Sequence, residues 1–215
     1  MIKDKFTLEL KARFRDMIDD TIEDGNERGV DLCMDKKGKL YASNTVCTGI
    51  ECEVILTDPK ESCKKDVLIG NFHTHPYIPM YLEEFQEKFK RFPEGEELID
   101  FAEQSVIKIH KERGIKDTSV NTPSHIDLLS AIIEGCKYKG AGTVCATSDV
   151  VPYETECWSP KVDLHKDIYK TDCKKAKREH ITILTSESTN GKKRSIAWAT
   201  KLFNKETIDL SDDKR

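Results

Sequence analysis

The segment FHTHP at residues 72–76 carries the side chains best suited to chemistry. In a β-strand, side chains two residues apart point to the same side, so His73 and His75 can direct two imidazole nitrogens at one point. Imidazole is a common zinc ligand, and a hydrolytic zinc site needs a third protein ligand and a position open to water. A His-x-His pair alone is more often two ordinary histidines, so the interpretation depends on finding that third ligand.

A second segment, PSHID at residues 123–127, offers the third ligand. Ser124 is expected to start a helix, with Asp127 one turn later on the same side. By itself this spacing is typical of a helix cap, in which the serine oxygen accepts a backbone N–H and the acid favours the helix dipole. Combined with the two histidines, it predicts a metal site formed by His73, His75 and Asp127.

A strand and a helix must therefore meet at the site. The apolar run at 66–74 predicts a buried strand that ends in the histidines, and 124–137 is expected to be a helix. The other predicted elements are a helix over 3–24 that Gly25 and Asn26 end, and strands near 30–34, 40–46, 52–56, 141–146, 180–185 and 195–202. A central sheet with helices around it indicates an α+β or mixed α/β fold.

A long polar stretch, residues 77–121, separates the histidines from Ser124. Apolar stripes predict helices over 82–92 and 96–113 within it. Because loop-closure entropy grows slowly with length, such a stretch can leave and return to the same place without breaking the site. We expect a single domain over 1–215 in which 77–121 is a helical insertion, and both a lid over the site and an interaction surface remain open as its role.

The order His-x-His-Pro and then Ser-x-x-Asp resembles the signature of the JAMM (MPN+) metallopeptidases, which include metal-dependent deubiquitinases and their prokaryotic relatives. The family pattern also has a glutamate at an early strand, and Glu27 matches that place, with Glu51 and Glu53 as alternatives. The segment CTGIECEV at 47–54 is similar to one in archaeal members. The resemblance covers roughly 27–147 and departs from the family in the long stretch 77–121.

The resemblance implies a JAB/MPN architecture, which is cytidine-deaminase-like, with a mostly antiparallel sheet. It implies one zinc ion on His73, His75 and Asp127, a zinc-bound water as nucleophile, Glu27 as the base and Ser124 as the oxyanion donor. The expected reaction is hydrolysis of an isopeptide or peptide bond in a protein substrate, such as a conjugate of a ubiquitin-like modifier. The alternative is a catalytically inactive JAB-like scaffold or protein-binding module.

Composition narrows the class of protein. The 215 residues suffice for one domain, and 37% hydrophobic with 34% charged residues indicates a folded chain with a highly charged surface. A net charge of -4 argues against a nucleic-acid partner, and the basic clusters at 174–178 and 192–194 are expected to be solvated. No apolar run is long enough to span a membrane, and the N-terminus lacks a signal-peptide core, so we expect a cytoplasmic protein. The scarcity of Gln suggests a heat-loving source.

The eight cysteines contain no C-x-x-C pair, which argues against a second zinc site of standard spacing. In an ordinary cytosol they would be mostly buried thiols, whereas in a hyperthermophile some could form disulfides. Cys47, Cys52 and Cys63 are the nearest in sequence and the best candidates for one bridge.

The remaining histidines carry no ligand pattern of their own. We expect His125 to line the cleft beside Ser124, and we expect ordinary surface or core roles for His110, His165 and His180.

Overall fold

The computed structural model describes residues 1–43, 47–48, 59–185 and 195–211. Its elements are η1 (Lys3–Lys5), α1 (Leu8–Asp24), β1 (Arg28–Met34), β2 (Leu40–Ala42), β3 (Cys47–Thr48), α2 (Pro59–Ser62), β4 (Val67–His75), α3 (Tyr77–Phe89), α4 (Glu97–Glu112), α5 (His125–Lys137), β5 (Thr143–Ser148), β6 (Glu154–Pro160), η2 (Asp167–Tyr169), α6 (Lys170–Thr185), α7 (Ala197–Thr200) and β7 (Phe203–Asp209).

One central sheet organises the described chain. Its strand order is β2-β1-β4-β5-β6-β7, and β3 also pairs with β1. Only the β4–β5 pair is parallel; every other pair in the described sheet is antiparallel. The predicted α+β class with a mostly antiparallel sheet is therefore confirmed.

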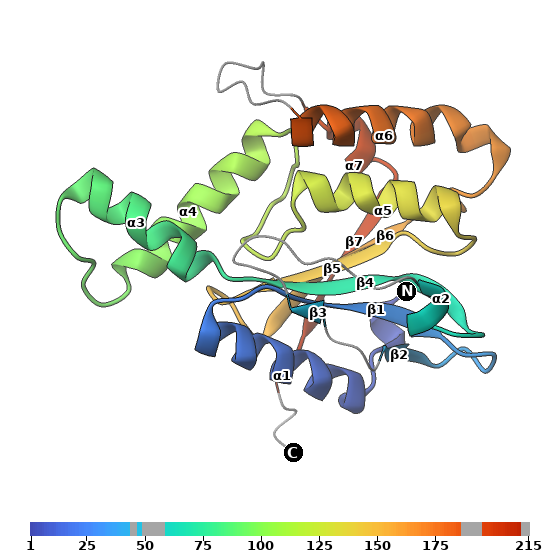
Figure 1. The fold of residues 1–215 in the computed structure, drawn as a ribbon, viewed down its shortest axis with the longest axis horizontal. Coiled ribbons are helices and arrows are strands. Elements are labelled where there is room, and N and C mark those ends of the chain that lie inside the picture. The colour runs from blue at the N-terminus through green and yellow to red at the C-terminus, as the bar shows by residue number, and fades with distance from the viewer. Residues whose placement is uncertain (44–46, 49–58, 186–194, 212–215) are drawn as a thin grey trace.

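Helices cover both faces of this sheet (Figure 1). Helix α1 lies on one face and α5 and α6 lie on the other. Under α1, the ring of Phe14 stacks on Phe72 of β4, with centroids 3.7 Å apart. On the opposite face, Leu128 and Ile132 of α5 are fully buried against a core that includes Val144 of β5. The alternation of β4 thus places Phe72 toward α1 and the neighbouring His73 toward α5.

Strand β4 approaches β5 closely at Gly70. A Cβ atom at this position would collide with the backbone carbonyl of Thr143, so only glycine fits. On the other side of β4, the register with β1 shifts between Leu32 and Cys33. From Asn71 to His73, β4 pairs regularly with β1 on one side and with β5 on the other. This pairing fixes the end of β4 at the centre of the sheet.

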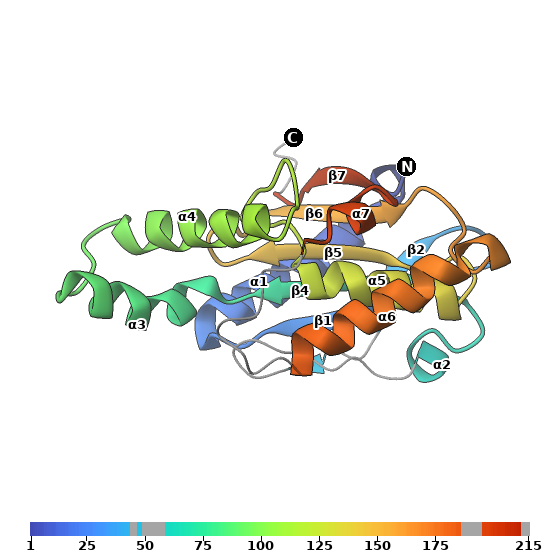
Figure 2. The same ribbon diagram turned by 90° about the horizontal axis from the view of Figure 1, so that it is seen from above.

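Helices α3 and α4 project from the body as a helical arm (Figure 2). They pack on each other through an aromatic cluster in which Phe101 of α4 contacts Tyr81 and Phe85 of α3 edge-to-face. Helix α4 matches the predicted 96–113 closely. Helix α3 starts at Tyr77 rather than at the predicted 82, because the distant Asp149 carboxylate caps its first turn, a contact that no local pattern reveals.

The predicted strands at 180–185 and 195–202 are wrong. Residues 180–185 end helix α6, and α7 followed by a turn occupies 197–202, with the last strand β7 only after it. The sequence ITILT at 181–185 is rich in β-branched residues that favour strands, but α6 is one continuous helix from Lys170 that packs along α5. Strand β6 was not predicted. The strand expected at 52–56 lies outside the described residues.

Three disulfides join described residues: Cys33–Cys63, Cys136–Cys173 and Cys145–Cys157. The expected bridge among Cys47, Cys52 and Cys63 is thus wrong as far as Cys63 is concerned, because its partner comes from β1. Among the described helices, none has the length and apolar character needed to cross a membrane.

Candidate metal centre

Three segments that are far apart in the sequence meet at the end of β4. His73 and His75 are the last residues on one face of β4, Glu27 directly precedes β1, and the pairing of Gly29 with His73 brings β1 alongside. Glu27, His73 and His75 are all buried and offer ligand atoms that lie within 4.8 Å of one another. This group could hold a metal ion.

Asp127 approaches the same point from the first turn of α5. Its Oδ2 atom lies 3.3 Å from Nε2 of His73 and 3.7 Å from Nε2 of His75. Burial alone would raise the pKa of Asp127, but the two imidazoles outweigh it and hold that pKa well below its usual value. For His73, burial lowers the pKa, and the Asp127 carboxylate more than reverses this, so the net shift is upward. The short distances and these opposite pKa shifts both show that the Nε2 atoms of the two histidines face the Oδ2 atom of Asp127.

The Nδ1 atom of each histidine contacts a polar side chain on the side of the ring away from Asp127. Nδ1 of His73 lies 3.2 Å from Oδ1 of Asn71, and Nδ1 of His75 lies 3.0 Å from the hydroxyl of Tyr77. An imidazole that donates its Nδ1–H presents the Nε2 lone pair, which is the form that binds a metal. Burial raises the pKa of Tyr77 well above its usual value, so its hydroxyl stays neutral and can accept that hydrogen.

The buried Nε2 atom of His73 indicates whether a cation fits between these side chains. Among the residues that the structure describes, Nε2 of His73 has no hydrogen-bond partner of good geometry, although it is inaccessible to solvent. Buried polar atoms are nearly always satisfied, so such an atom indicates a missing ligand. Two imidazole nitrogens and a carboxylate oxygen are a donor set that suits a divalent transition metal. The residues therefore fit a metal ion.

Ser124 lies directly beside this donor set as the N-cap of α5. Its Oγ accepts the backbone N–H of Asp127 at 3.2 Å, and Oδ2 of Asp127 accepts the backbone N–H of Ser124 at 2.7 Å, a complete capping box. The cap interpretation of Ser-x-x-Asp is thus correct, and it does not compete with a role at a metal. A hydroxyl that accepts one hydrogen bond still has its own hydrogen to donate.

Buried polar contacts hold these segments in place. The fully buried Asn121 donates to the carbonyls of Val151 and Glu154 and accepts from the hydroxyl of Ser148 at 2.7 Å. It ties the segment before Ser124 to the end of β5. On the other side, Arg28 binds the Asp24 carboxylate with two nitrogens at 2.8 and 2.7 Å, which fixes the chain beside Glu27.

The structure brings together all five residues that the sequence singled out, since Ser124 adjoins Asp127. The alternatives Glu51 and Glu53 lie outside the described residues. Sequence reasoning missed the supporting side chains Asn71, Tyr77 and Asp149. Asn71 and Tyr77 each lie two residues from a histidine, a spacing that could have identified them; nothing local pointed to Asp149.

Two further histidines lie near the donor set. His110 of α4 is 3% exposed, and burial, followed by the charge of His75, lowers its pKa to about 4. Burial also lowers the pKa of His125 to about 4. The charge of the Asp127 carboxylate opposes both shifts. His110 is thus a buried core residue, which is one of the two roles expected for it. Unlike most buried polar groups, its Nδ1 atom has no hydrogen-bond partner among the described residues.

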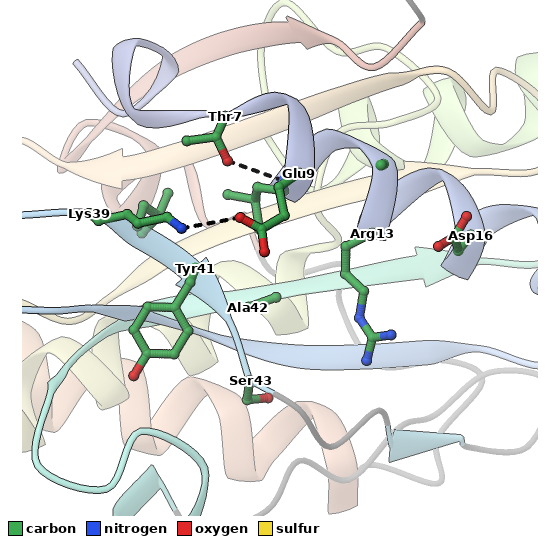
Figure 3. Close-up of a pocket in the computed structure, with 11 residues that line it drawn as sticks. Thr7, Glu9, Arg13, Asp16, Lys39, Tyr41, Ala42 and Ser43 are labelled. Carbon is green, nitrogen blue, oxygen red and sulfur yellow. Dashed lines mark hydrogen bonds and ion pairs between the residues drawn. The ribbon is translucent and has the colours of Figure 1, made fainter.

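A separate groove of about 450 Å³ lies between α1 and the edge strand β2 (Figure 3). Polar and apolar side chains line it about equally, and an ion pair between Lys39 and Glu9, 3.1 Å long, joins its two sides. None of the residues that line it belongs to the metal centre. The groove is therefore separate from the metal centre.

Comparisons of the chain with protein-family models, with curated proteins and with solved structures found no match. The resemblance to the JAMM metallopeptidases therefore depends on the motif residues and their arrangement.

Proposed function

We propose that this protein is a zinc-dependent metallopeptidase that hydrolyses an isopeptide or peptide bond in a protein substrate. One observation carries the proposal: Glu27, His73 and His75 bring ligand atoms within 4.8 Å of one another, and the Asp127 carboxylate lies beside both histidines from a third segment. A pair of chance histidines would not be expected to meet two carboxylates there, each buried or partly buried and each delivered by a different element.

His73, His75 and Asp127 would hold the zinc ion, since two imidazoles and a carboxylate are a ligand set of hydrolytic zinc sites. Zinc bound there would supply Lewis-acid activation of a water molecule at neutral pH. The contacts of Asn71 and Tyr77 orient the two imidazoles for this task before any ligand arrives. Asp127 is likewise fixed in advance by its bond to the Ser124 backbone.

Glu27 acts as the general base. It is 7% exposed and lies with His73 and His75 in the same group of ligand atoms, within reach of a water molecule there. In this role Glu27 takes a proton from water and gives it to the leaving amine. The same geometry also permits Glu27 to be a metal ligand, and these two roles predict different metal contents for a Glu27 variant.

Ser124 stabilises the developing oxyanion. Its hydroxyl is held by the capping box with its own hydrogen still available, so it can donate toward a carbonyl oxygen beside Asp127. The hydroxyl is preorganised because its position is set by the start of α5 rather than by the substrate.

The substrate is proposed to be a protein whose tail reaches the metal centre, such as a conjugate of a ubiquitin-like modifier. The helical arm begins at Tyr77, directly after the second histidine, and extends away from the body (Figure 1). That shape favours a surface for a bound protein over a lid. Exposed apolar side chains on the arm, among them Phe89 and Phe92, are consistent with this role.

We also propose that the protein works in the cytoplasm of a heat-loving organism. Three disulfides among the described residues would be unusual in the cytosol of a mesophile, whereas intracellular proteins of hyperthermophiles contain them often. Thiol counting in freshly lysed source cells tests this, since fewer than three bridges in the native protein would contradict it.

The function is tested with a fusion in which a ubiquitin-like protein ends in Gly-Gly before a reporter. Cleavage that a chelator abolishes and zinc restores is the expected result, with the Asp127→Ala variant inactive. A protein that binds zinc and the fusion but never cleaves it would instead support the inactive scaffold.

A further inference from the structure

Helix α6 presents a stripe of basic and apolar side chains to solvent. Lys170, Lys174, Lys177, Ile181 and Leu184 follow one another at steps of four and three residues, so they lie on one face of the helix. All five are exposed, Ile181 at 59% and Leu184 at 63%. The helix contains five basic and two acidic residues, although the whole chain has a net charge of -4. We call these five exposed residues the basic stripe.

The charge of the basic stripe is only partly neutralised within the chain. Lys170 forms an ion pair with Asp167 at 2.9 Å. Among the described residues, no ion pair involves Lys174 or Lys177. Exposed apolar side chains beside such charges fit an acidic protein surface that has apolar groups of its own.

The outer part of the helical arm has the opposite charge. Residues 83–103, which we call the acidic tip, contain eight acidic and three basic residues. Two of these basic residues are engaged within the arm, since Arg91 pairs with Glu97 at 2.6 Å and Lys88 lies 4.9 Å from the ring centroid of Phe101. Six acidic residues are exposed and have no ion pair in the part of the chain that the structure describes: Glu83, Glu84, Glu87, Glu94, Glu96 and Asp100.

Aromatic rings give the acidic tip an apolar centre. Phe89 and Phe92 are both exposed, Phe92 at 75%, between the acidic residues of α3 and those of α4. Aromatic side chains with charged residues around them are typical of protein–protein interfaces. Within one copy the two surfaces lie apart, because the arm projects from the body while α6 lies along α5 (Figures 1 and 2).

We propose that the acidic tip of one copy binds the basic stripe of a second copy. The two surfaces are complementary in charge, and each has exposed apolar side chains for the other to cover. In a two-fold dimer each copy lends its tip to the stripe of the other, so both surfaces of both copies are used and the assembly closes.

This inference goes beyond the proposed hydrolysis and uses no residue of the metal centre. It bears on that function in one respect. Because the proposed substrate surface also lies on the arm, a protein substrate and the second copy would compete for it.

The oligomeric state of the full chain tests the contact. Sedimentation velocity is measured up to about 200 µM protein, in about 50 mM and about 500 mM salt. We expect an equilibrium between monomer and dimer whose Kd rises at least about 10-fold in the higher salt, because salt screens exposed charge pairs.

Charge reversal on either surface should also weaken the dimer. Glu83→Lys with Glu87→Lys on the tip, or Lys174→Glu with Lys177→Glu on the stripe, should raise the Kd at least about 10-fold. Each exposed ion pair contributes about 2- to 5-fold in affinity, and the reversed charges repel their neighbours.

Mixing the two variants should restore dimers of the original affinity, because both contacts of the mixed dimer again join opposite charges. This restoration would also show that both variants are folded. Lys64→Glu with Lys65→Glu, at exposed lysines outside both surfaces, is the control matched in charge to the stripe variant and should leave the Kd unchanged.

Protein that stays monomeric at about 200 µM in the lower salt would overturn the contact. A dimer that neither reversal weakens would overturn it too, as would two variants that do not associate when mixed. Zinc uptake is measured on the same samples, so the two proposals fail separately. A monomer that binds zinc would overturn only the dimer, and a dimer that takes up no zinc would contradict only the proposed function.

Discussion

Asp149 is expected to position both the helical arm and the second histidine ligand. Asp149 is 8% exposed, and its carboxylate accepts the backbone N–H groups of Tyr77 and Ile78, each at 2.9 Å. Its own backbone N–H donates to the carbonyl of His75 at 3.2 Å. Asp149→Ala would therefore leave two N–H groups at the start of α3 without an acceptor, immediately after the ligand.

The size of the effect follows from these contacts. Removing a helix N-cap costs about 0.5–2 kcal/mol, and we expect the upper end, about 2 kcal/mol, because the two N–H groups lie where water reaches poorly. With an unfolding entropy of about 2.1 cal/mol/K per residue, a chain of 215 residues should lose about 4 °C in Tm. A disturbed support behind His75 should also weaken zinc binding about 10-fold.

Asp149→Ala is compared with the unmodified protein by thermal denaturation and zinc titration at pH 7.5. This pH lies above the pKa of Asp149, which burial raises to about 6, so the carboxylate is ionised. Asp35→Ala is the matched control, because Asp35 also accepts two backbone N–H groups, those of Lys37 and Lys39, but in an exposed turn. Equal Tm and zinc affinity in the two variants would refute the role given to Asp149.

Three further predictions concern other parts of the molecule. Glu27→Ala should retain zinc and lose cleavage of the fusion at least about 100-fold; loss of zinc would make Glu27 a ligand. Burial, followed by the charge of Asp31, raises the pKa of Glu134 to about 7, so folding is favoured while Glu134 is protonated, and this stability is lost as the pH rises toward and through 7. Glu134→Gln should therefore match the unmodified protein at pH 4 and exceed it by about 3 kcal/mol at pH 8 in urea unfolding, whereas a pH-independent difference would contradict this. Replacing Cys136 and Cys173 with Ala should lower stability by about 4 kcal/mol, from the loop that the bridge closes, and an unchanged urea midpoint would exclude that bridge.

The convergence of His73, His75 and Asp127 could be predicted because its signals are local. The alternation of β4 fixes the common direction of His73 and His75, and the cap spacing fixes Asp127 relative to Ser124. Gly25 ends α1 in the left-handed conformation, as its residue type indicates. Each of these features depends only on neighbours within one element.

Other features could not be predicted because distant contacts decide them. The contact with Asp149 lets α3 begin at Tyr77. Cys63 pairs with the distant Cys33 of β1, whereas a partner nearer in sequence was expected. Residues 181–185 favour a strand locally, yet they continue α6 because the helix packs along α5. His110 carries no motif, and only the fold buries its ring.

The most direct test is the zinc content of the purified protein, measured by mass spectrometry of the metal beside the His75→Ala and His165→Ala variants. About one zinc per chain in the unmodified protein and in His165→Ala, with none in His75→Ala, is the predicted result. Unmodified protein that takes up no zinc even after reconstitution, or a His75→Ala variant that retains it, would contradict the metal centre.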